Sequence, residues 1–118
     1  MTEPKALSAT VTNPRLGSLS IVEGQEFSLE VEVKSRGLTN VLAEIFFDNN
    51  YLSLNDGLLE YQLSPGGMEQ TYELSWELQA RQEAGQPVLI DINVRGDHGQ
   101  GDSISQKCVV NLSIIKES

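Results

Sequence analysis

The chain has 118 residues with a single cysteine, 39% of its residues are hydrophobic, and its net charge at pH 7 is −9. This length predicts one domain over residues 1–118 with a hydrophobic core of its own. The acidity disfavours binding to nucleic acid, whose phosphates demand a basic surface, and equally disfavours binding to anionic membranes. The lone Cys108 excludes an internal disulfide and any metal cluster built from cysteines, and we expect it in the core.

No stretch of the sequence approaches the roughly 18 consecutive apolar residues that a bilayer-spanning helix needs. We therefore expect no direct insertion into a membrane. The N-terminal residues "MTEPKALSAT" also lack the basic and apolar segments of a signal peptide. Export would accordingly need a signal that lies outside this sequence or that Met1 has replaced.

Alternation of apolar and polar residues dominates the chain from its start, which predicts β-strands. We expect strands at 5–12 with a continuation to 22, and at 26–34, 40–47, 58–63, 69–78, 87–95 and 104–115. No helix is expected, because the one plausible segment, 77–84, is short and continues directly from a strand. The predicted inward positions are Phe27, Leu29, Val31 and Val33; Val41, Ala43, Ile45 and Phe47; Tyr72, Leu74, Trp76 and Leu78; Val88, Ile90, Ile92 and Val94; and Ile104, Cys108, Val110, Leu112 and Ile114.

Turn-forming residues fall between these runs. "SPGG" (64–67) combines a proline with two glycines that can take positive φ, and "NDG" (55–57) resembles a hairpin turn. About seven short strands in roughly 100 residues predict an all-β fold, an immunoglobulin-like antiparallel β-sandwich. In that topology 5–12, 26–34, 69–78 and 58–63 form one sheet, and 40–47, 87–95 and 104–115 form the other.

Trp76 is the only tryptophan of the chain. It shares its phase with Tyr72, Leu74 and Leu78, so we expect it to pack between the sheets rather than to stack on a ligand. A backbone carbonyl would satisfy its indole N–H.

Several of these motifs are similar to those of a known family. "LSPGG", a strand that ends in "ELSW", a glycine and then "PVLIDINV" resemble CARDB, the cell adhesion related domain found in bacteria. Upstream, "FSLEVEVKSRGLTNVLAEIFFD" corresponds to the second and third strands of that module. The resemblance implies a non-catalytic module of a larger surface or secreted prokaryotic protein, used for adhesion, protein interaction or spacing between domains.

The sequence contains none of the common catalytic motifs, such as G-x-S-x-G, a P-loop, H-E-x-x-H or EF-hand spacing. His98, the only histidine, lies in the glycine-rich segment "GDHGQGD" (96–102), where a catalytic triad is not expected. Two carboxylates acting on a sugar would have to face each other across a cleft that small sandwiches rarely have. We therefore expect no enzyme and no cofactor.

Calcium would need oxygen ligands that converge on one point. Asp and Asn residues cluster in "FDNN" (47–50), in "NDG" and in "GDHGQGD", but an immunoglobulin-like topology puts the first and last of these at opposite ends. Such residues are also ordinary turn formers. We expect no metal site. The triplet Asn111-Leu112-Ser113 matches a glycosylation sequon, which matters only in a glycosylating host.

The outward positions of 26–34 and 69–78 are acidic. They are Glu30, Glu32, Glu73 and Glu77, with Lys34 as the opposing charge. Like charges on neighbouring strands cost stability. The stripe either keeps the protein soluble and its sheets apart, or receives a basic partner.

The other predicted sheet carries outward apolar residues, and we expect these to form a docking face: Leu42, Phe46, Leu89 and Val109. They interleave with polar residues, Glu44, Asp91, Asn93, Arg95 and Lys107. An apolar patch with a polar rim is typical of a surface that binds a neighbouring domain, another protein or, weakly, a second copy. The alternative is scattered exposed residues, or a patch that a chain terminus covers.

Two functions from different classes stand. The first is a non-enzymatic module of a surface or secreted protein, and the second is a cytoplasmic sandwich used as a scaffold or for oligomerisation. A carbohydrate-binding module is a third and remote class, because it would need outward aromatic residues, for which Phe46, Tyr51 and Tyr61 are the candidates.

Overall fold

The computed structural model describes residues 6–14, 17–97 and 103–116. These residues form β-strands and, within the described ranges, no helix, so no described helix could span a membrane. The strands are β1 (Ala6–Asn13), β2 (Ser18–Val22), β3 (Glu26–Arg36), β4 (Asn40–Phe46), β5 (Leu52–Asp56), β6 (Glu60–Leu63), β7 (Gln70–Ala80), β8 (Val88–Asp97) and β9 (Ser103–Ile115).

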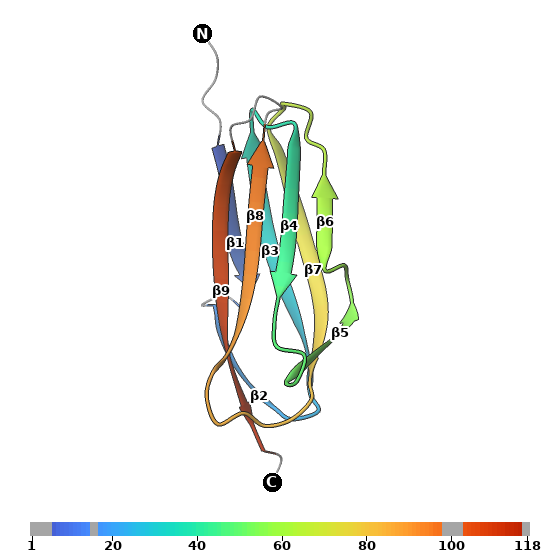
Figure 1. Ribbon diagram of the computed structural model, residues 1–118, viewed down its shortest axis with the longest axis vertical. Coiled ribbons are helices and arrows are strands. Elements are labelled where there is room, and N and C mark those ends of the chain that lie inside the picture. Colours follow the sequence, from blue (N-terminus) through green and yellow to red (C-terminus); the bar gives the residue numbers. More distant parts are fainter. Residues whose placement is uncertain (1–5, 15–16, 98–102, 117–118) are drawn as a thin grey trace.

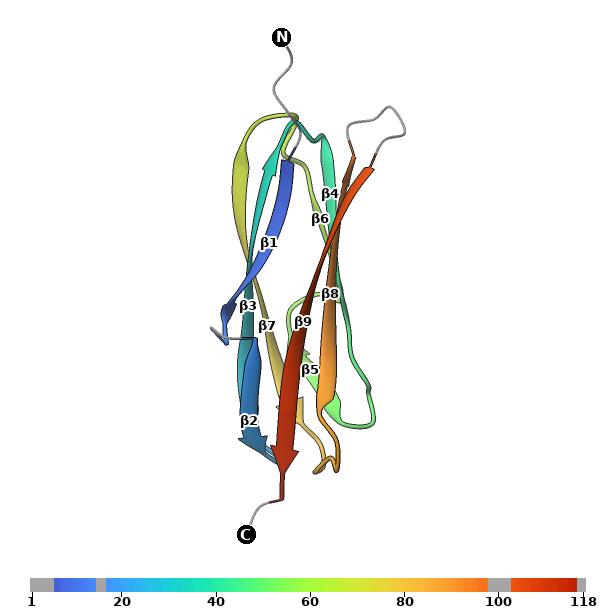
Figure 2. The same ribbon diagram turned by 90° about the vertical axis from the view of Figure 1, so that its left-hand side faces the viewer.

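The strands form two packed sheets, which are seen edge-on in Figure 2. The first sheet has the order β1-β3-β7-β5, and the second sheet has the order β2-β9-β8-β4-β6. Neighbouring strands are antiparallel except β2 and β9, which run parallel. The predicted immunoglobulin-like β-sandwich is confirmed.

The first predicted run divides between the two sheets. β1 pairs with β3 in the first sheet, and after a break at Pro14, which has no N–H to donate, β2 pairs with β9 in the second sheet. Where the β1–β3 register shifts, side chains replace ladder bonds. Thr12 Oγ1 donates to the carbonyl of Glu30 (3.3 Å), and Asn13 Nδ2 donates to that of Ser28 (3.0 Å).

The predicted pairing of the segment 58–63 is wrong. The strand in this segment, β6, pairs with β4 in the second sheet, while β5, which the sequence pattern did not reveal, occupies the edge of the first sheet beside β7. "NDG" is therefore a crossover between sheets and not a hairpin turn. Gly57 has φ +106°, and a Cβ there would lie 3.0 Å from Ser75 O and from Trp76 Cδ1, so the chain crosses close against β7.

The core lies between the two sheets and contains most of the predicted inward residues. Four of them are only partly buried and pack against its edge: Phe47, Tyr72, Ile104 and Cys108. Trp76 is 0% exposed, and its indole N–H donates to the carbonyl of Leu58 at 2.6 Å, as expected for a core anchor. Tyr61 packs edge-on against the indole with ring centroids 5.5 Å apart. The core therefore fixes the crossover that leads into β6 as well as the two sheets.

The body is elongated, with principal extents of 61 × 22 × 19 Å. β1 begins at one end, where Ala6 lies opposite Arg36, and β9 finishes at the other end, where Ile115 O accepts a bond of 2.9 Å from Glu23 N (Figure 1). The described chain thus enters at one pole and leaves at the opposite one.

Candidate interaction surface

The outward face of the second sheet carries a cluster of exposed apolar side chains. The register places Phe46, Asp91 and Val109 in one row across β4, β8 and β9. Leu89 lies one outward position further along β8, diagonal to both apolar neighbours. Phe46, Leu89 and Val109 are 48%, 50% and 41% exposed, so the three form a contiguous apolar cluster around one carboxylate.

Leu42, the fourth predicted docking residue, lies apart from this cluster. It is half-buried and shares a row with Arg95 and Gln62, two rows from Phe46. The row between them holds Glu44, Asn93 and Lys107. The structure therefore brings three of the four predicted residues together and separates the fourth by a polar row.

Leu59 belongs to the same surface, and the sequence pattern did not reveal it. It is 58% exposed, its carbonyl accepts a bond of 3.0 Å from Ile45 N, and with Phe46 and Glu60 it lines a shallow groove of about 300 Å³. The predicted topology missed Leu59 because it assigned the segment 58–63 to the first sheet. The signal was the double leucine in the polar context "NDGLLE".

Charges of both signs surround the cluster. Lys107 Nζ lies 3.8 Å from Asp91 Oδ1, an exposed and long ion pair of small energetic weight. Arg95 is exposed and makes no ion pair with another described residue. Glu44 lies directly opposite Glu60, so this edge of the face is acidic.

The first sheet presents a different outward face. Glu32 and Glu73 are directly opposite each other, and Lys34 lies 3.5 Å from Glu32. Glu77 accepts a hydrogen bond of 2.5 Å from Ser28 Oγ. These acidic residues and Glu30 form the predicted acidic stripe, which contains no large apolar side chain.

The candidate sugar-binding aromatic residues do not form one platform. Tyr61 packs on Trp76 and its hydroxyl donates to Ser75 O at 3.1 Å, so it is a structural residue. Tyr51 is half-buried and lines an open cavity of about 480 Å³ together with Asp48 and residues 84–89. Only Phe46 of the three is exposed on the sheet face.

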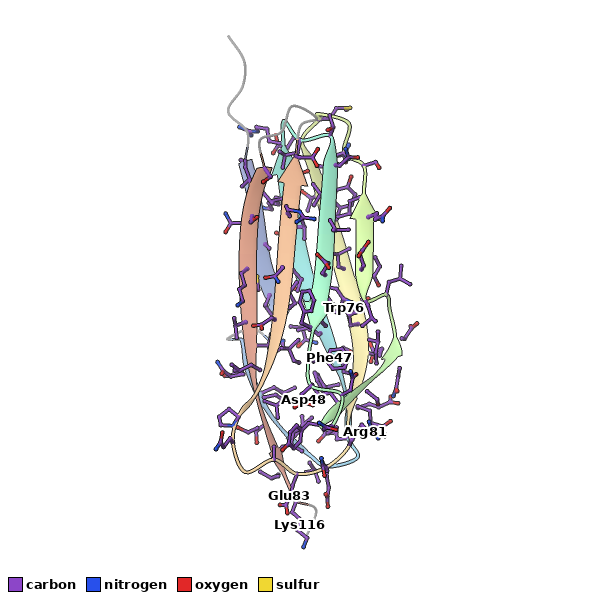
Figure 3. The ribbon with its side chains drawn as sticks, viewed as in Figure 1. Phe47, Asp48, Trp76, Arg81, Glu83 and Lys116 are labelled. Carbon is purple, nitrogen blue, oxygen red and sulfur yellow. The ribbon has the colours of Figure 1, made fainter. Side chains whose placement is uncertain are left out.

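Hydrogen bonds connect the β4–β5 loop with the segment that follows β7. Gln82 Nε2 donates to Asn50 O at 2.9 Å, and Arg81 donates to Asn49 O at 2.5 Å. Asp48 Oδ1 accepts from Asn50 N at 2.9 Å. Figure 3 shows Asp48 and Arg81 below Trp76, in the lower half of the molecule. The polar groups of this loop are thus used for local structure.

The first and the last of the Asp- and Asn-rich segments lie in opposite halves of the molecule. Asp48 lies in the lower half, whereas Asp97 ends β8 at the upper pole opposite Asn40 (Figure 1). His98 and Asp102 lie outside the described residues. Among the residues that are described, no group of three or more potential metal ligands occurs. The absence of a calcium site stays a prediction.

Cys108 links the two sheets at their open side. It is half-buried on β9, and its Sγ donates to Ala9 O on β1 at 3.1 Å. Burial raises the pKa of the thiol above its ordinary value, which disfavours the reactive thiolate. This environment suits a packing residue better than a nucleophile.

Comparison with known proteins finds no matching family model and no matching curated protein. Solved structures do match: a PapD-like domain of human CEP192 has a TM-score of 0.64 at 10% identity, covering 100% of this chain and 92% of that chain. BcpA, the major pilin subunit of Bacillus cereus, has 0.61 at 8%, covering 95% of this chain and 41% of that one. Murine CRIg has 0.56 at 10%, covering 92% and 98%. At these identities the likeness establishes the immunoglobulin-like β-sandwich fold.

Proposed function

We propose that the chain is a non-catalytic β-sandwich module that connects and separates parts of a larger surface or secreted prokaryotic protein. The observation that carries this proposal is the position of the two ends: β1 begins and β9 finishes at opposite poles of an elongated body. Segments joined there would be held apart by the length of the sandwich. The resemblance to CARDB motifs supports the same role, and the fold also occurs in a pilin subunit.

The pairing of the terminal strands suits a module under tension. A pull between Ala6 and Ile115 acts along the strands, because β1 and β9 run along the long axis. All five residues of β2 pair with β9 in parallel, from Ser18 opposite Asn111 to Val22 opposite Ile115. Such a pull shears this ladder, so its hydrogen bonds carry the load together instead of opening one after another.

Single-molecule pulling tests the proposal. Handles attached before Ala6 and after Lys116 should give one cooperative unfolding event at high force. In a matched control, handles at Gly24 and Gly85, which follow β2 and precede β8, pull β3 and β7 apart from one end. This control should unfold at a clearly lower force. Equal forces in the two geometries would contradict the proposed spacer role.

The location is tested separately in the organism that makes the protein. Fractionation should find the protein at the cell surface or in the medium, and brief protease treatment of intact cells should remove it. Recovery from the cytosolic fraction alone would overturn the proposed location and favour an intracellular scaffold.

A further inference from the structure

The outward face of the second sheet has an internal symmetry that the linear sequence conceals. On β8, Asp91 and Arg95 lie at equal distances on either side of Asn93, and both are outward positions. On β4, Phe46 lies opposite Asp91 and Leu42 lies opposite Arg95. The row through Asn93 therefore divides the face into two halves. One half has Asp91 on β8 and Phe46 on β4, and the other has Arg95 on β8 and Leu42 on β4.

Consider a two-fold axis that lies just above this row, parallel to the sheet and perpendicular to the strands. Rotation about this axis exchanges the two halves. It lays a second copy face to face on the first, with β8 antiparallel to β8. Asp91 of each copy then meets Arg95 of the other, and Phe46 of each meets Leu42 of the other. From this charge complementarity we propose that the protein forms an isologous dimer through the β4–β8–β9 face.

The electrostatics of the molecule favour this face over the opposite one. The net charge of −9 repels a second copy in general, and the acidic stripe of the first sheet has only Lys34 to offset its glutamates. The second sheet presents Arg95 and Lys107 at outward positions of the same face. Arg95, which has no ion pair within the described residues, gains a carboxylate partner in the dimer.

The geometry also sets the strength of the association. In this geometry Leu89 and Val109 of each copy face polar residues of the other, so Phe46 and Leu42 supply the apolar contact. This contact is much smaller than the roughly 800 Å² per partner of a standard stable interface. Glu44, Glu60 and Lys107 all lie in the dividing row, so the axis brings each of them near its own counterpart, which opposes association. We therefore expect a reversible dimer with a dissociation constant on the order of micromolar.

Reversing the charge of Arg95 or of Asp91 distinguishes this dimer from other modes of association. Arg95→Asp leaves two carboxylates facing each other at both symmetry-related contacts, and Asp91→Arg leaves two guanidinium groups there. Each variant alone should be monomeric in sedimentation velocity at concentrations where the unaltered protein is dimeric, with association weakened by more than about 100-fold. An equimolar mixture of the two variants should form a dimer again, because both contacts then pair opposite charges.

The controls match the change in charge on the other sheet. Lys34→Asp and Glu73→Arg alter the net charge by the same amounts on the first sheet, and neither they nor their mixture should change the dimer beyond a small shift. Circular dichroism establishes that each variant is folded. If a reversal variant does not fold, Arg95→Gln and Asp91→Asn remove one charge each, and each should weaken association by about tenfold.

Three results would overturn the proposal. They are an unaltered protein that stays monomeric at millimolar concentration, single reversals that leave the dimer intact, and a mixture that stays monomeric. The dimer does not depend on the spacing role, because the pulling experiments concern one copy, so each proposal can fail without the other.

Discussion

The two outward faces of the sandwich are built by the same alternation and differ in chemistry. The first sheet exposes glutamates on adjacent strands, with Glu32 directly opposite Glu73, and it offers no large apolar contact. The second sheet exposes Phe46, Leu89 and Val109 around a charged residue. A face of like charges resists contact with its own kind, whereas a mixed face permits it. The same alternation therefore gives this protein two outward faces of different chemistry, and only the face of the second sheet combines apolar groups with charges of both signs.

Both faces belong to sheets that pack on one core, and Trp76 is the largest fully buried side chain in that core. Trp76→Ala removes a fully buried indole and leaves Leu58 O without its donor, so we expect a loss of about 3–5 kcal/mol in unfolding free energy. Urea denaturation measures this loss. Trp76→Phe, which keeps most of the packing, should cost less. A loss below about 1 kcal/mol for the alanine variant would mean that Trp76 is not a major stabilising residue of the core.

The difference between inward and outward positions can be tested at neighbouring residues of one strand. Phe46→Glu should leave the melting temperature nearly unchanged, because Phe46 is 48% exposed. It should weaken self-association by about 30-fold, since the dimer would bury the exposed half of two Phe46 side chains at about 1 kcal/mol each. Ile45→Glu, the control, puts a carboxylate at a buried position and should unfold the domain. Unfolding by Phe46→Glu as well would assign Phe46 to the core.

The buried residues also include one polar side chain, that of Ser35. Its side chain is 2% exposed, and within the described residues its Oγ has no hydrogen-bond partner. Because a buried unsatisfied hydroxyl is costly, Ser35→Ala should raise the unfolding free energy by about 1 kcal/mol. Ser28→Ala, which removes the bond to Glu77, should bring no such gain. Destabilisation by Ser35→Ala would indicate that the hydroxyl has a partner.

The acidic stripe should show the smallest effect. Glu73→Lys replaces a repulsion with Glu32 by an attraction, so we expect a gain of a few tenths of a kcal/mol at low salt. The gain should shrink as salt rises, because the pair is exposed. Glu83→Lys makes the same change of charge in a loop and serves as the control. An equal gain in both variants would attribute the effect to net charge rather than to this pair.

The sequence predicts the strands and their phases well because side-chain alternation is a local property. Trp76, Leu29 and Ile92 are buried as their phases require. β5 is missed because Leu52 and Leu54 provide only two inward positions, too few to distinguish a strand from a loop. The partner of β6 is not a local property either, since the chain before it changes sheets at Gly57.

The candidate surface is predictable residue by residue but not as an arrangement. Exposure of Phe46, Leu89 and Val109 follows from phase alone. Their grouping depends on the register between strands, which hydrogen bonds between distant segments set. That register also separates Leu42 from the cluster and brings Leu59 beside Phe46.

The parallel pairing of β2 with β9 has a consequence for how the chain is made. Ser18 lies near the start of the described residues and pairs with Asn111 near their end. The β2–β9 ladder is therefore the last of the described ladders that a growing polypeptide can complete. Joining such distant segments carries a large loop-closure entropy and slows folding. Until β9 has been synthesised β2 therefore has no strand to pair with, and this edge of the second sheet closes only after residues 111–115 have left the ribosome.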